Sequence, residues 1–543
     1  MFLPDFNISL TFSYQFENKF IVIYKKNFLH GGFYMNRLIK ILRSRFFLGV
    51  LLILLEFALL LAVFVLLYEF FLPFAIVCWV FHIGILLYLI NHDDVSEFKL
   101  PWMLILCLLP VIGSYVYMLF SSNSTSKKEY ERYENSSREM IFHTVQTPTI
   151  KKLKDENLDA WLQANYLYNA VGMPCFDGSK TTYYALGEDF HLALLEELQK
   201  AESFIFMEYF IIQEGKMWDP IHEILKEKAA LGVNVYVIYD DFGCMTTIHE
   251  HYYRRLTEEG IHCIPGNKFK PVLSHIHNNR DHRKITVIDG KTGFTGGINL
   301  ADEYINTYPK HGHWKDTAIK IEGGAVKNLM ALFITSWNAQ SNEHLNCARF
   351  MGLPVGHTDG SGYMIPFGDG PEPVYTDNVG KNVYLNMIAA AKDYLYITTP
   401  YLICDRELLN ALRNAAKKGV DIRLITPHIP DKRTVHLMTR SNYEVLLKDG
   451  VKIYEYTPGF IHAKSFVCDD KFAVCGTINL DYRSLVHHFE CAAWMYNTDC
   501  IGDMKADFLA TQDVSQRITN DKTILSFPGR LFAEIMKIFS PLF

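Results

Sequence analysis

The sequence has no C-x-x-C pair, no H-E-x-x-H motif and no other cluster of Cys and His with the spacing of a zinc site. Its 11 cysteines are scattered between Cys78 and Cys500. A chain of this length can bury a large core without cross-links, so an odd and dispersed set of thiols predicts free cysteines in a reducing compartment. These absences argue against the classes of protein that depend on disulfides or structural zinc.

An excess of basic charge is also missing. The 53 Lys and Arg residues are outnumbered by 59 Asp and Glu residues, which gives a net charge of −6. Proteins that bind nucleic acid usually carry a basic surface to neutralise phosphates. We therefore expect no nucleic-acid partner.

Apolar residues are abundant, and they are concentrated near the N-terminus in three runs, at 45–70, 71–90 and 100–120. Each run is long enough to cross a bilayer as a helix, and none has the polar stripe of a helix at the surface of a soluble domain. We expect a membrane region at 45–120 with two or three transmembrane helices, preceded by an N-terminal extension at 1–44. The predicted location is the cell membrane, with a multi-pass topology.

The topology is set by basic residues on both sides of this region. They lie between Lys25 and Arg45 before the first run, and between Lys127 and Arg132 after the third. The positive-inside rule places both flanks, and with them the part of the chain that follows residue 120, in the cytoplasm, which requires an even number of crossings. Three runs give an odd number. Either one run is re-entrant or interfacial, or the charge rule fails at one end.

A polar, Ser-rich linker at 121–150 leads into a part of the chain where strand-like and helical patterns alternate, and this part contains an internal repeat. AESFIFMEYFII (201–212) resembles AKDYLYITTPYLI (391–403), and GFTGGINLADEY (293–304) resembles AVCGTINLDYRS (473–484). The unit is too long for a solenoid repeat, so the pattern predicts two copies of one α/β domain. The predicted domains span 151–350 and 351–543.

One short phrase occurs in each copy. HRKITVIDG (282–290) and HAKSFVCDD (462–470) both contain His-x-Lys-x4-Asp in a strand-like context. On a strand, the His and the Lys share a face, whereas the Asp falls on the opposite face. Parity therefore assigns the His and Lys to chemistry and the Asp to the end of the strand. The candidate catalytic set is His282, Lys284, Asp289, His462, Lys464 and Asp469.

If the two copies pack about a pseudo-twofold axis, these phrases bring two imidazoles and two ammonium groups to one site. Ammonium groups fixed in a cleft need an anion between them, and a phosphate provides one. One imidazole can then attack phosphorus while the other protonates the leaving alkoxide. Asn299 and Asn479, in the Gly-rich turns, are candidate phosphate-binding residues because their amides can donate to phosphoryl oxygens.

The repeated phrases, with the turns GGIN and GTINLDYRS, resemble the phospholipase D superfamily. More narrowly, the chain resembles bacterial cardiolipin synthases from about residue 45 to its end, in MEYFII (207–212), HWKDTAIKIEG (313–323), TTPYLICDREL (398–408), GVKIYEYTPGFIHAKSFVCDD (450–470) and LDYRSLVHHFE (480–490). Two positions depart from the family pattern: Asp281 stands where an amide is expected, and Thr477 where Ser is common. The resemblance implies two pseudo-twofold-related phospholipase D-like α/β sandwich domains, preceded by transmembrane helices.

The resemblance also implies a reaction, the transfer of a phosphatidyl group from one phosphatidylglycerol to another through a phosphatidyl-histidine. In this superfamily the His of the first phrase is usually the nucleophile, which assigns that role to His282 and the roles of general acid and later base to His462. Lys284 and Lys464 supply positive charge, so no metal and no cofactor are expected. The implied partners are phosphatidylglycerol and membrane lipids, and the sequence indicates no oligomeric state.

A nucleophilic imidazole needs a partner for its second nitrogen, and two carboxylates are placed to provide it. Asp316 and Glu490 each open the apolar strand that follows a Gly-Asn turn. In the superfamily such a carboxylate often reaches the His of the other half. We expect Glu490 to orient His282 and Asp316 to orient His462; the alternative is that both are surface carboxylates.

Other functions use the same residues. A phospholipase D-type hydrolase would take water as the acceptor, and a phosphatidylserine synthase would take serine. A nuclease of the superfamily is disfavoured by the apolar runs and the acidic balance. A catalytically inactive membrane scaffold would be supported by a missing His or Lys, yet all four are present. The C-terminal segment 527–543 has a helical apolar stripe, which can lie on a bilayer or pack against the catalytic domain.

Overall fold

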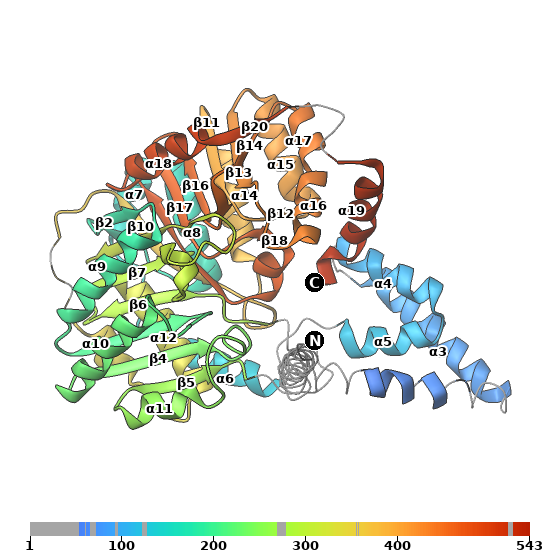
Figure 1. The fold of residues 1–543 in the computed structure, drawn as a ribbon, viewed down its shortest axis with the longest axis horizontal. Helices are drawn as coiled ribbons and strands as arrows, with labels where there is room; N and C mark the ends of the chain where they lie inside the picture. Colours follow the sequence, from blue (N-terminus) through green and yellow to red (C-terminus); the bar gives the residue numbers. More distant parts are fainter. Residues whose placement is uncertain are drawn as a thin grey trace, which may run out of the picture. The chain divides into compact units, whose positions relative to one another are not determined.

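The computed structural model describes residues 54–59, 61–63, 65, 72–92, 96–121, 127–268, 279–354, 356, 358–519 and 525–542. The predicted N-terminal extension and most of the first apolar run lie outside these residues. Figure 1 shows the order of the helices and strands along the chain.

Two mixed β-sheets form the body of the protein. The first has the strand order β2-β9-β7-β6-β3-β4-β5. Its strands are β2 (Lys180–Tyr184), β3 (Phe204–Tyr209), β4 (Asn234–Asp240), β5 (His262–Gly266), β6 (Lys284–Ile288), β7 (Thr292–Gly296) and β9 (Ala318–Glu322).

The second sheet has the order β1-β10-β19-β17-β16-β11-β13-β14-β20. Its strands are β1 (Phe176–Asp177), β10 (Tyr363–Asp369), β11 (Tyr394–Thr398), β13 (Asp421–Pro427), β14 (Lys452–Tyr456), β16 (Ser465–Cys468), β17 (Phe472–Gly476), β19 (Glu490–Tyr496) and β20 (Ser515–Ile518). Two small two-stranded pairs join β8 (His313–Lys315) to β15 (Gly459–Ile461) and β12 (Leu402–Ile403) to β18 (Leu480–Asp481).

The two sheets repeat one topology. Strands β10, β19, β17, β16, β11, β13 and β14 of the second sheet follow one another as β2, β9, β7, β6, β3, β4 and β5 do in the first. The three strands that follow β2 in the first sheet (β3, β4, β5) and β10 in the second (β11, β13, β14) run parallel, and the strand at the His-x-Lys phrase pairs antiparallel to the first of them. The internal repeat is therefore a repeat of structure, and each phrase lies at the same place in its sheet.

Helices cover both sheets. They are α7 (Thr149–Glu156), α8 (Leu158–Val171), α9 (Gly187–Gln199), α10 (Trp218–Ala230), α11 (Tyr252–Glu258), α12 (Val326–Gln340), α13 (Cys347–Met351), α14 (Val379–Ala390), α15 (Arg406–Lys417), α16 (Arg433–Ser441), α17 (Tyr443–Lys448) and α18 (Ile501–Asp513). Short 3-10 or π-helical turns occupy Asp302–Ile305, Arg483–His487 and Ser540–Leu542.

Alternation along β3 shows how the first sheet is covered. Ile205 and Met207 face the core formed with α9, α10 and α11, whereas Phe204 and Phe206 face α12. Successive side chains of a strand point to opposite faces, so a strand buried on both faces is apolar throughout. The core on the α12 face continues without interruption into the second sheet, so the two halves share one interior.

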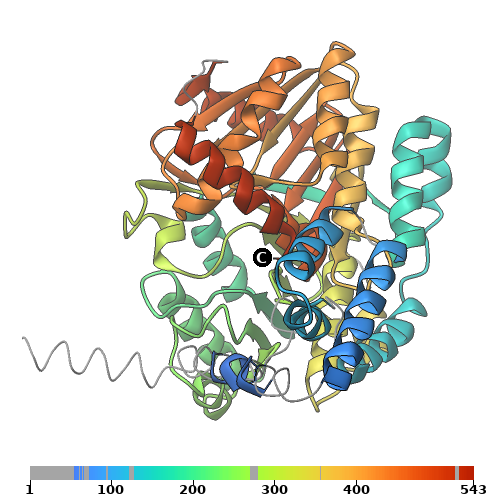
Figure 2. The same cartoon turned by 90° about the vertical axis from the view of Figure 1, so that its right-hand side faces the viewer.

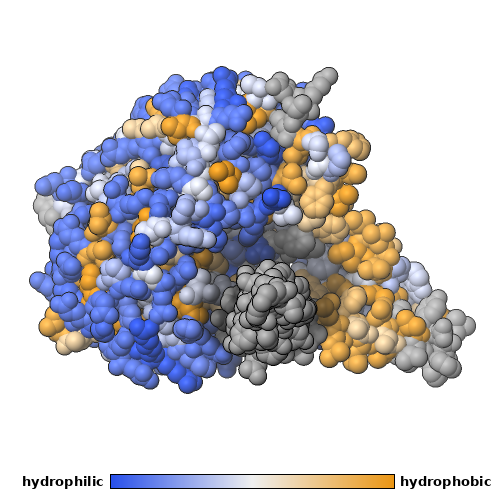
Figure 3. Space-filling model, in the orientation of Figure 1, coloured by the Kyte–Doolittle hydropathy of each residue, from blue (hydrophilic) through white to orange (hydrophobic). Residues whose placement is uncertain are grey.

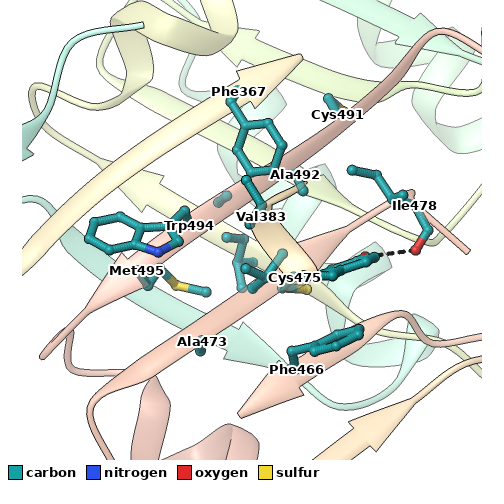
Figure 4. Packing of buried hydrophobic residues seen from close by; sticks show 14 of the residues in the cluster. Phe367, Val383, Phe466, Ala473, Cys475, Ile478, Cys491, Ala492, Trp494 and Met495 are labelled. Carbon is teal, nitrogen blue, oxygen red and sulfur yellow. Dashed lines mark hydrogen bonds between the residues drawn. The ribbon is translucent and has the colours of Figure 1, made fainter. Parts of the chain in front are cut away.

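The interior of the second half is tightly packed around β16, β17 and β19 (Figure 4). The ring of Tyr384 on α14 stacks on Phe466, with centroids 4.0 Å apart, and its hydroxyl donates to the carbonyl of Ile478 at 2.8 Å. This hydrogen bond holds the turn that carries Asn479, so core packing and the position of the Gly-Asn turn are linked.

The predicted linker contains a packed helix. Helix α6 (Lys127–Ile141) lies against α12 and buries Tyr133, Ser136 and Met140. The ring of Tyr133 stacks on Phe489, with centroids 4.9 Å apart. The spacing of these three residues places them on one helical face, a signal that the polar composition of the segment obscures.

The second and third apolar runs form α3 (Leu72–Asn91), α4 (Ser96–Leu108) and α5 (Ile112–Phe120). In the part of the chain that the structure describes, no helix combines the length and the apolar character needed to cross a membrane. The third run does not form one continuous helix, because α4 ends before Pro110 and Val111, and Val111 has a φ of 64°. The rings of Trp102 and Tyr117 then meet edge to face, with centroids 5.3 Å apart.

The C-terminal segment forms the amphipathic helix α19 (Phe527–Phe539), which packs on α16 and α4 (Figure 2). Ala533 is fully buried, and Met536 contacts the small cluster that contains Tyr482. Phe527, Leu531 and Ile535 are exposed. The helix thus packs against the α/β body with one face and leaves apolar side chains on the other.

Candidate active site

The two histidines of the repeated phrases lie where the halves meet. His282 lies two residues before the start of β6, and its main-chain N–H donates to the carbonyl of Phe489 at 2.8 Å. His462 precedes β16, and its N–H donates to the carbonyl of Lys315 at 2.7 Å. The expectation that each His lies on the strand itself is therefore wrong. At each His the main chain has not yet joined the sheet of its own half, and its N–H hydrogen-bonds to the other half.

Each imidazole contacts a carboxylate of the opposite half. Nδ1 of His282 lies 3.0 and 2.9 Å from the two oxygens of Glu490, and Nδ1 of His462 lies 2.6 Å from Oδ2 of Asp316. Both carboxylates are fully buried. A carboxylate at Nδ1 favours the tautomer with a hydrogen on that nitrogen, which leaves Nε2 as the nucleophile or base.

Burial lowers the pKa of both imidazoles, because it disfavours the charged form. The pKa of His282 falls to about 3, although Glu490 opposes the shift, and the pKa of His462 falls to about 4. Burial would raise the pKa of Glu490, but its attraction to His282 outweighs this and holds the pKa below its usual range. Burial thus favours the neutral form of both imidazoles.

The lysines of the two phrases lie in the same buried cluster. Nζ of Lys284 donates to the carbonyl of His282 at 2.5 Å, and Nζ of Lys464 lies 2.8 Å from Nδ1 of His462. Burial lowers the pKa of Lys284 to about 7, helped by the charge of Lys464, and burial lowers the pKa of Lys464 to about 8. An anion between these ammonium groups would oppose both shifts, so the site is arranged to accept one.

The aspartates of the phrases lie elsewhere. Asp289 accepts hydrogen bonds from the main-chain N–H groups of Glu202, Ser203 and Phe204 at 2.8–2.9 Å. Asp469 accepts the equivalent bonds from residues 392, 393 and 394 at 2.7–3.0 Å. Both aspartates have a φ of 53°, in the left-handed region that Asp tolerates. Each one therefore ties a β-turn to the start of the neighbouring strand, β3 or β11, as parity suggested.

The two candidate phosphate ligands differ. Nδ2 of Asn299 donates to the hydroxyl of Tyr304 at 2.7 Å, and its Oδ1 accepts the N–H of Ile211 at 3.1 Å. Within the described residues, Oδ1 of Asn479 is buried and has no hydrogen-bond partner. The amide of Asn299 is thus already used to position Tyr304, whose ring lies edge-on to His462 at 5.7 Å between centroids. Phosphate binding by either residue stays a prediction.

The first departure from the family pattern has a partner. The carboxylate of Asp281 lies 3.1 Å from Nε of Arg283, and Nη2 of Arg283 lies 3.3 Å from Glu208. All three side chains are buried. The guanidinium of Arg283 offsets the negative charge of Asp281. The effect of that charge on the imidazole of His282, the next residue in the sequence, is therefore reduced.

The second departure bears directly on the site. The hydroxyl of Thr477 donates to Oε2 of Glu490. His488, which sequence reasoning did not single out, is buried, with its ring 5.6 Å from that of His282 and its Nδ1 3.6 Å from Oε1 of Glu490. The adjacent histidines of HHFE are the only sequence signal for it. His282, His488 and Glu490 also present ligand atoms within 4.8 Å of one another, close enough to hold a metal ion.

The geometry assembles two imidazoles backed by carboxylates, with two lysines, in one buried cluster. Such an arrangement suits nucleophilic substitution at an anionic centre.

Comparisons with known proteins agree with this chemistry. The family described as "Cardiolipin synthase, PLD-like domain" matches residues 194–313 and 384–511, which carry both histidine phrases between them. A cardiolipin synthase of Alkalihalophilus pseudofirmus is 32% identical over 85% of this chain and 92% of its own length. One of Geobacillus kaustophilus is 34% identical over 80% of this chain and 86% of its own.

Among solved structures, a phosphatidylserine synthase of Haemophilus influenzae Rd KW20 is similar, with a TM-score of 0.54 and 14% identity over 70% of this chain and 97% of that one. At this identity the likeness concerns the fold, which both proteins share. The extent and identity of the sequence matches decide the family: the chain belongs to the cardiolipin synthase family, whose members carry phospholipase D-like domains.

Proposed function

We propose that this protein is a cardiolipin synthase. It transfers the phosphatidyl group of one phosphatidylglycerol to a hydroxyl of a second, and the products are cardiolipin and glycerol. The observation that carries the proposal is the pairing of each phrase histidine with a buried carboxylate of the other half, at 2.9 Å for His282 and Glu490 and 2.6 Å for His462 and Asp316. A transfer in two steps needs two such imidazoles, one to carry the group and one to move protons.

In the first step Nε2 of His282 attacks the phosphorus of phosphatidylglycerol. A P–N bond forms, the bond from phosphorus to the headgroup glycerol oxygen breaks, and His462 gives a proton to the departing alkoxide. Glycerol leaves, and the phosphatidyl group remains on His282. The Nδ1 hydrogen bond to Glu490 stabilises the positive charge that develops on the ring.

In the second step the headgroup hydroxyl of another phosphatidylglycerol gives its proton to His462. Its oxygen attacks phosphorus, the P–N bond breaks, and cardiolipin forms. His462 starts the first step protonated, and the anionic phosphodiester supports this because a nearby negative charge raises the pKa of an imidazole. Lys284 and Lys464 hold the charge that builds on the phosphoryl oxygens.

The substrate is a membrane lipid, and we propose that the protein is anchored in the cell membrane by its N-terminal apolar region, with the catalytic domain in the cytoplasm. Exposed apolar side chains on α4 and α19, among them Leu100, Leu108, Phe527 and Leu531, support a lipid-facing position for these helices (Figure 3). The break between α4 and α5 supports a re-entrant or interfacial position for 100–120, which leaves an even number of crossings to the preceding runs.

The test is to incubate the purified full-length protein with phosphatidylglycerol vesicles and to quantify lipids and glycerol. Cardiolipin and glycerol in equal amounts are expected, and EDTA should leave the yield unchanged because the lysines supply the positive charge. Phosphatidic acid as the main lipid product would indicate a hydrolase instead. Absence of any lipid product from a folded protein would favour an inactive scaffold.

A further inference from the structure

The two orienting carboxylates occupy matched places but are held differently. Oδ1 of Asp316 accepts the main-chain N–H of Thr317 at 2.8 Å, and a Cβ at Gly297 would collide with that carboxylate. Gly297 in GGIN corresponds to Thr477 in GTIN, whose hydroxyl donates to Glu490. The main chain thus fixes the shorter carboxylate, whereas side chains must fix the longer and more flexible one.

The aromatic neighbours of the two histidines differ in the same way. Trp314 stands two residues before Asp316, and its ring centroid lies 5.7 Å from that of His462. His488 stands two residues before Glu490, with its ring 5.6 Å from that of His282. Where one half carries an indole, the other carries an imidazole that points a nitrogen at the carboxylate.

The contacts around His488 leave its Nδ1 available to one hydrogen-bond partner, the carboxylate of Glu490. The side chain is 10% exposed, and Nδ1 is buried without a hydrogen-bond partner within the described residues. Oε1 of Glu490 lies 3.6 Å from this nitrogen. This separation is a few tenths of an ångström beyond a hydrogen bond, and catalytic hydrogen bonds that are long in a substrate-free enzyme often shorten when substrate binds.

We propose that His488 is a positioning residue for His282: in the substrate complex its Nδ1–H donates to Oε1 of Glu490 and fixes the carboxylate against the nucleophile. The proposal rests on the proposed function, since it deepens the account of the nucleophilic half. With Thr477 on Oε2 and His488 on Oε1, Glu490 has a donor for each oxygen besides His282. A carboxylate held at both oxygens keeps the Nδ1 hydrogen bond, and with it the nucleophilic tautomer, through both steps.

Three substitutions test whether His488 acts as a hydrogen-bond donor or only fills space. In His488→Asn the amide nitrogen takes the place of Nδ1, so the variant should keep kcat within about threefold. In His488→Phe the ring volume is kept and the donor is lost, and in His488→Gln the amide nitrogen is displaced toward the Nε2 position. For the last two we expect kcat about 10–100-fold lower, with KM within about threefold, the range seen when a group that supports a catalytic ligand is lost.

A purely structural role of His488 would not change the rate of the first step. This rate is therefore the measurement that distinguishes the two roles. A phosphatidyl p-nitrophenyl ester releases a good leaving group that needs little help from His462, so its burst rate reports mainly on His282. His488→Phe should slow this burst as much as it slows turnover. In the other half, Asp316→Asn should slow turnover with phosphatidylglycerol more than it slows the burst.

Thermal melting of each variant separates folding from chemistry; if His488→Phe does not fold, the comparison of His488→Asn with His488→Gln decides. Equal activity of the Phe and unmodified proteins, or equal losses in Asn and Phe, would overturn the proposal. If the unmodified protein makes no cardiolipin but gives a burst, the proposed acceptor is wrong and the burst series still tests His488. If it gives neither product nor burst, both proposals fall.

Discussion

Nδ1 of His282 lies 2.9 Å from Oε2 of Glu490, a residue that is 208 positions later in the chain and belongs to the other sheet. His462 and Asp316 make the reciprocal contact. Each half of the protein therefore supplies a histidine whose imidazole contacts a carboxylate of the other half.

The amide substitutions Glu490→Gln and Asp316→Asn test these contacts. Each should lower turnover about 10²–10⁴-fold, the range for loss of an orienting carboxylate or of proton transfer. Turnover is measured with phosphatidylglycerol vesicles, and circular dichroism and melting temperature verify the fold. Near-normal turnover in either variant would show that its carboxylate is not needed for the reaction.

Activity should fall as pH rises through the pKa values of the lysines. Burial lowers these from 10.5 to about 7 for Lys284 and about 8 for Lys464, so the substrate-free site loses positive charge between pH 6 and 9. We expect kcat/KM to fall across this range and kcat to fall less, because a bound phosphodiester raises both pKa values. A kcat/KM that is constant from pH 6 to 9 would contradict protonated lysines as the phosphate ligands.

The same shifts have a consequence for stability. The unfolded chain keeps its lysines protonated up to about pH 10.5, whereas the folded site does not, so the free energy of unfolding should rise with pH between about 7 and 10 from this source. Glycerophosphoglycerol, a soluble diester, should raise the melting temperature at pH 6.5 and lose this effect by pH 9. Lys284→Met is the matched control, in which the pH dependence of the ligand effect should weaken.

Asp289 and Asp469 should matter for folding rather than for chemistry. Each carboxylate accepts three main-chain N–H groups. Replacing Asp289 by Ala should cost about 1–3 kcal/mol of unfolding free energy for the unsatisfied donors. The kcat per folded molecule should stay within a few-fold of the unmodified value. Asp393→Ala, which removes an exposed side chain next to the counterpart residue Asp469, is the control for stability. A large loss of kcat in a stable Asp289→Ala protein would give this residue a chemical role.

Membrane attachment is tested by washing. The apolar runs should keep the protein in the membrane fraction after high-salt and carbonate treatment, because buried apolar helices do not respond to ionic strength. Release of intact protein by carbonate would contradict an integral anchor. Accessibility of cysteines introduced at 127–140 to a membrane-impermeant reagent would report the side on which the catalytic domain lies.

Much of the fold could be predicted from the sequence, because the internal repeat gives two sequence segments for each strand position. A mostly apolar run, FIFMEY, identifies β3, and its counterpart β11 supports the same assignment. The break between α4 and α5 is harder to predict, because the residues on both sides of it are apolar and only Pro110 marks its position. Helix α6 was hidden for the opposite reason: three buried residues suffice to dock it.

The features of the site also fall into those that the sequence predicts and those that it does not. Spacing within one phrase limits where its Lys and Asp can point, so parity predicts that Lys284 lies in the site and that Asp289 lies at the end of the strand. Contacts between the halves depend on how two distant turns meet, and spacing alone does not encode this. His488 illustrates the point, since its importance comes from sharing a carboxylate with His282 and from replacing the indole of Trp314.

The most direct test of the account is to trap the covalent intermediate. The protein is mixed with radiolabelled phosphatidylglycerol, quenched in denaturant at a pH that preserves phosphoramidates, and digested for peptide mapping. The label should be found on His282, should be absent from His282→Asn, and should accumulate in His462→Asn when an activated ester is the substrate. Label on His462 would reverse the roles of the two histidines, and turnover to cardiolipin with no label on either would contradict a phosphatidyl-histidine mechanism.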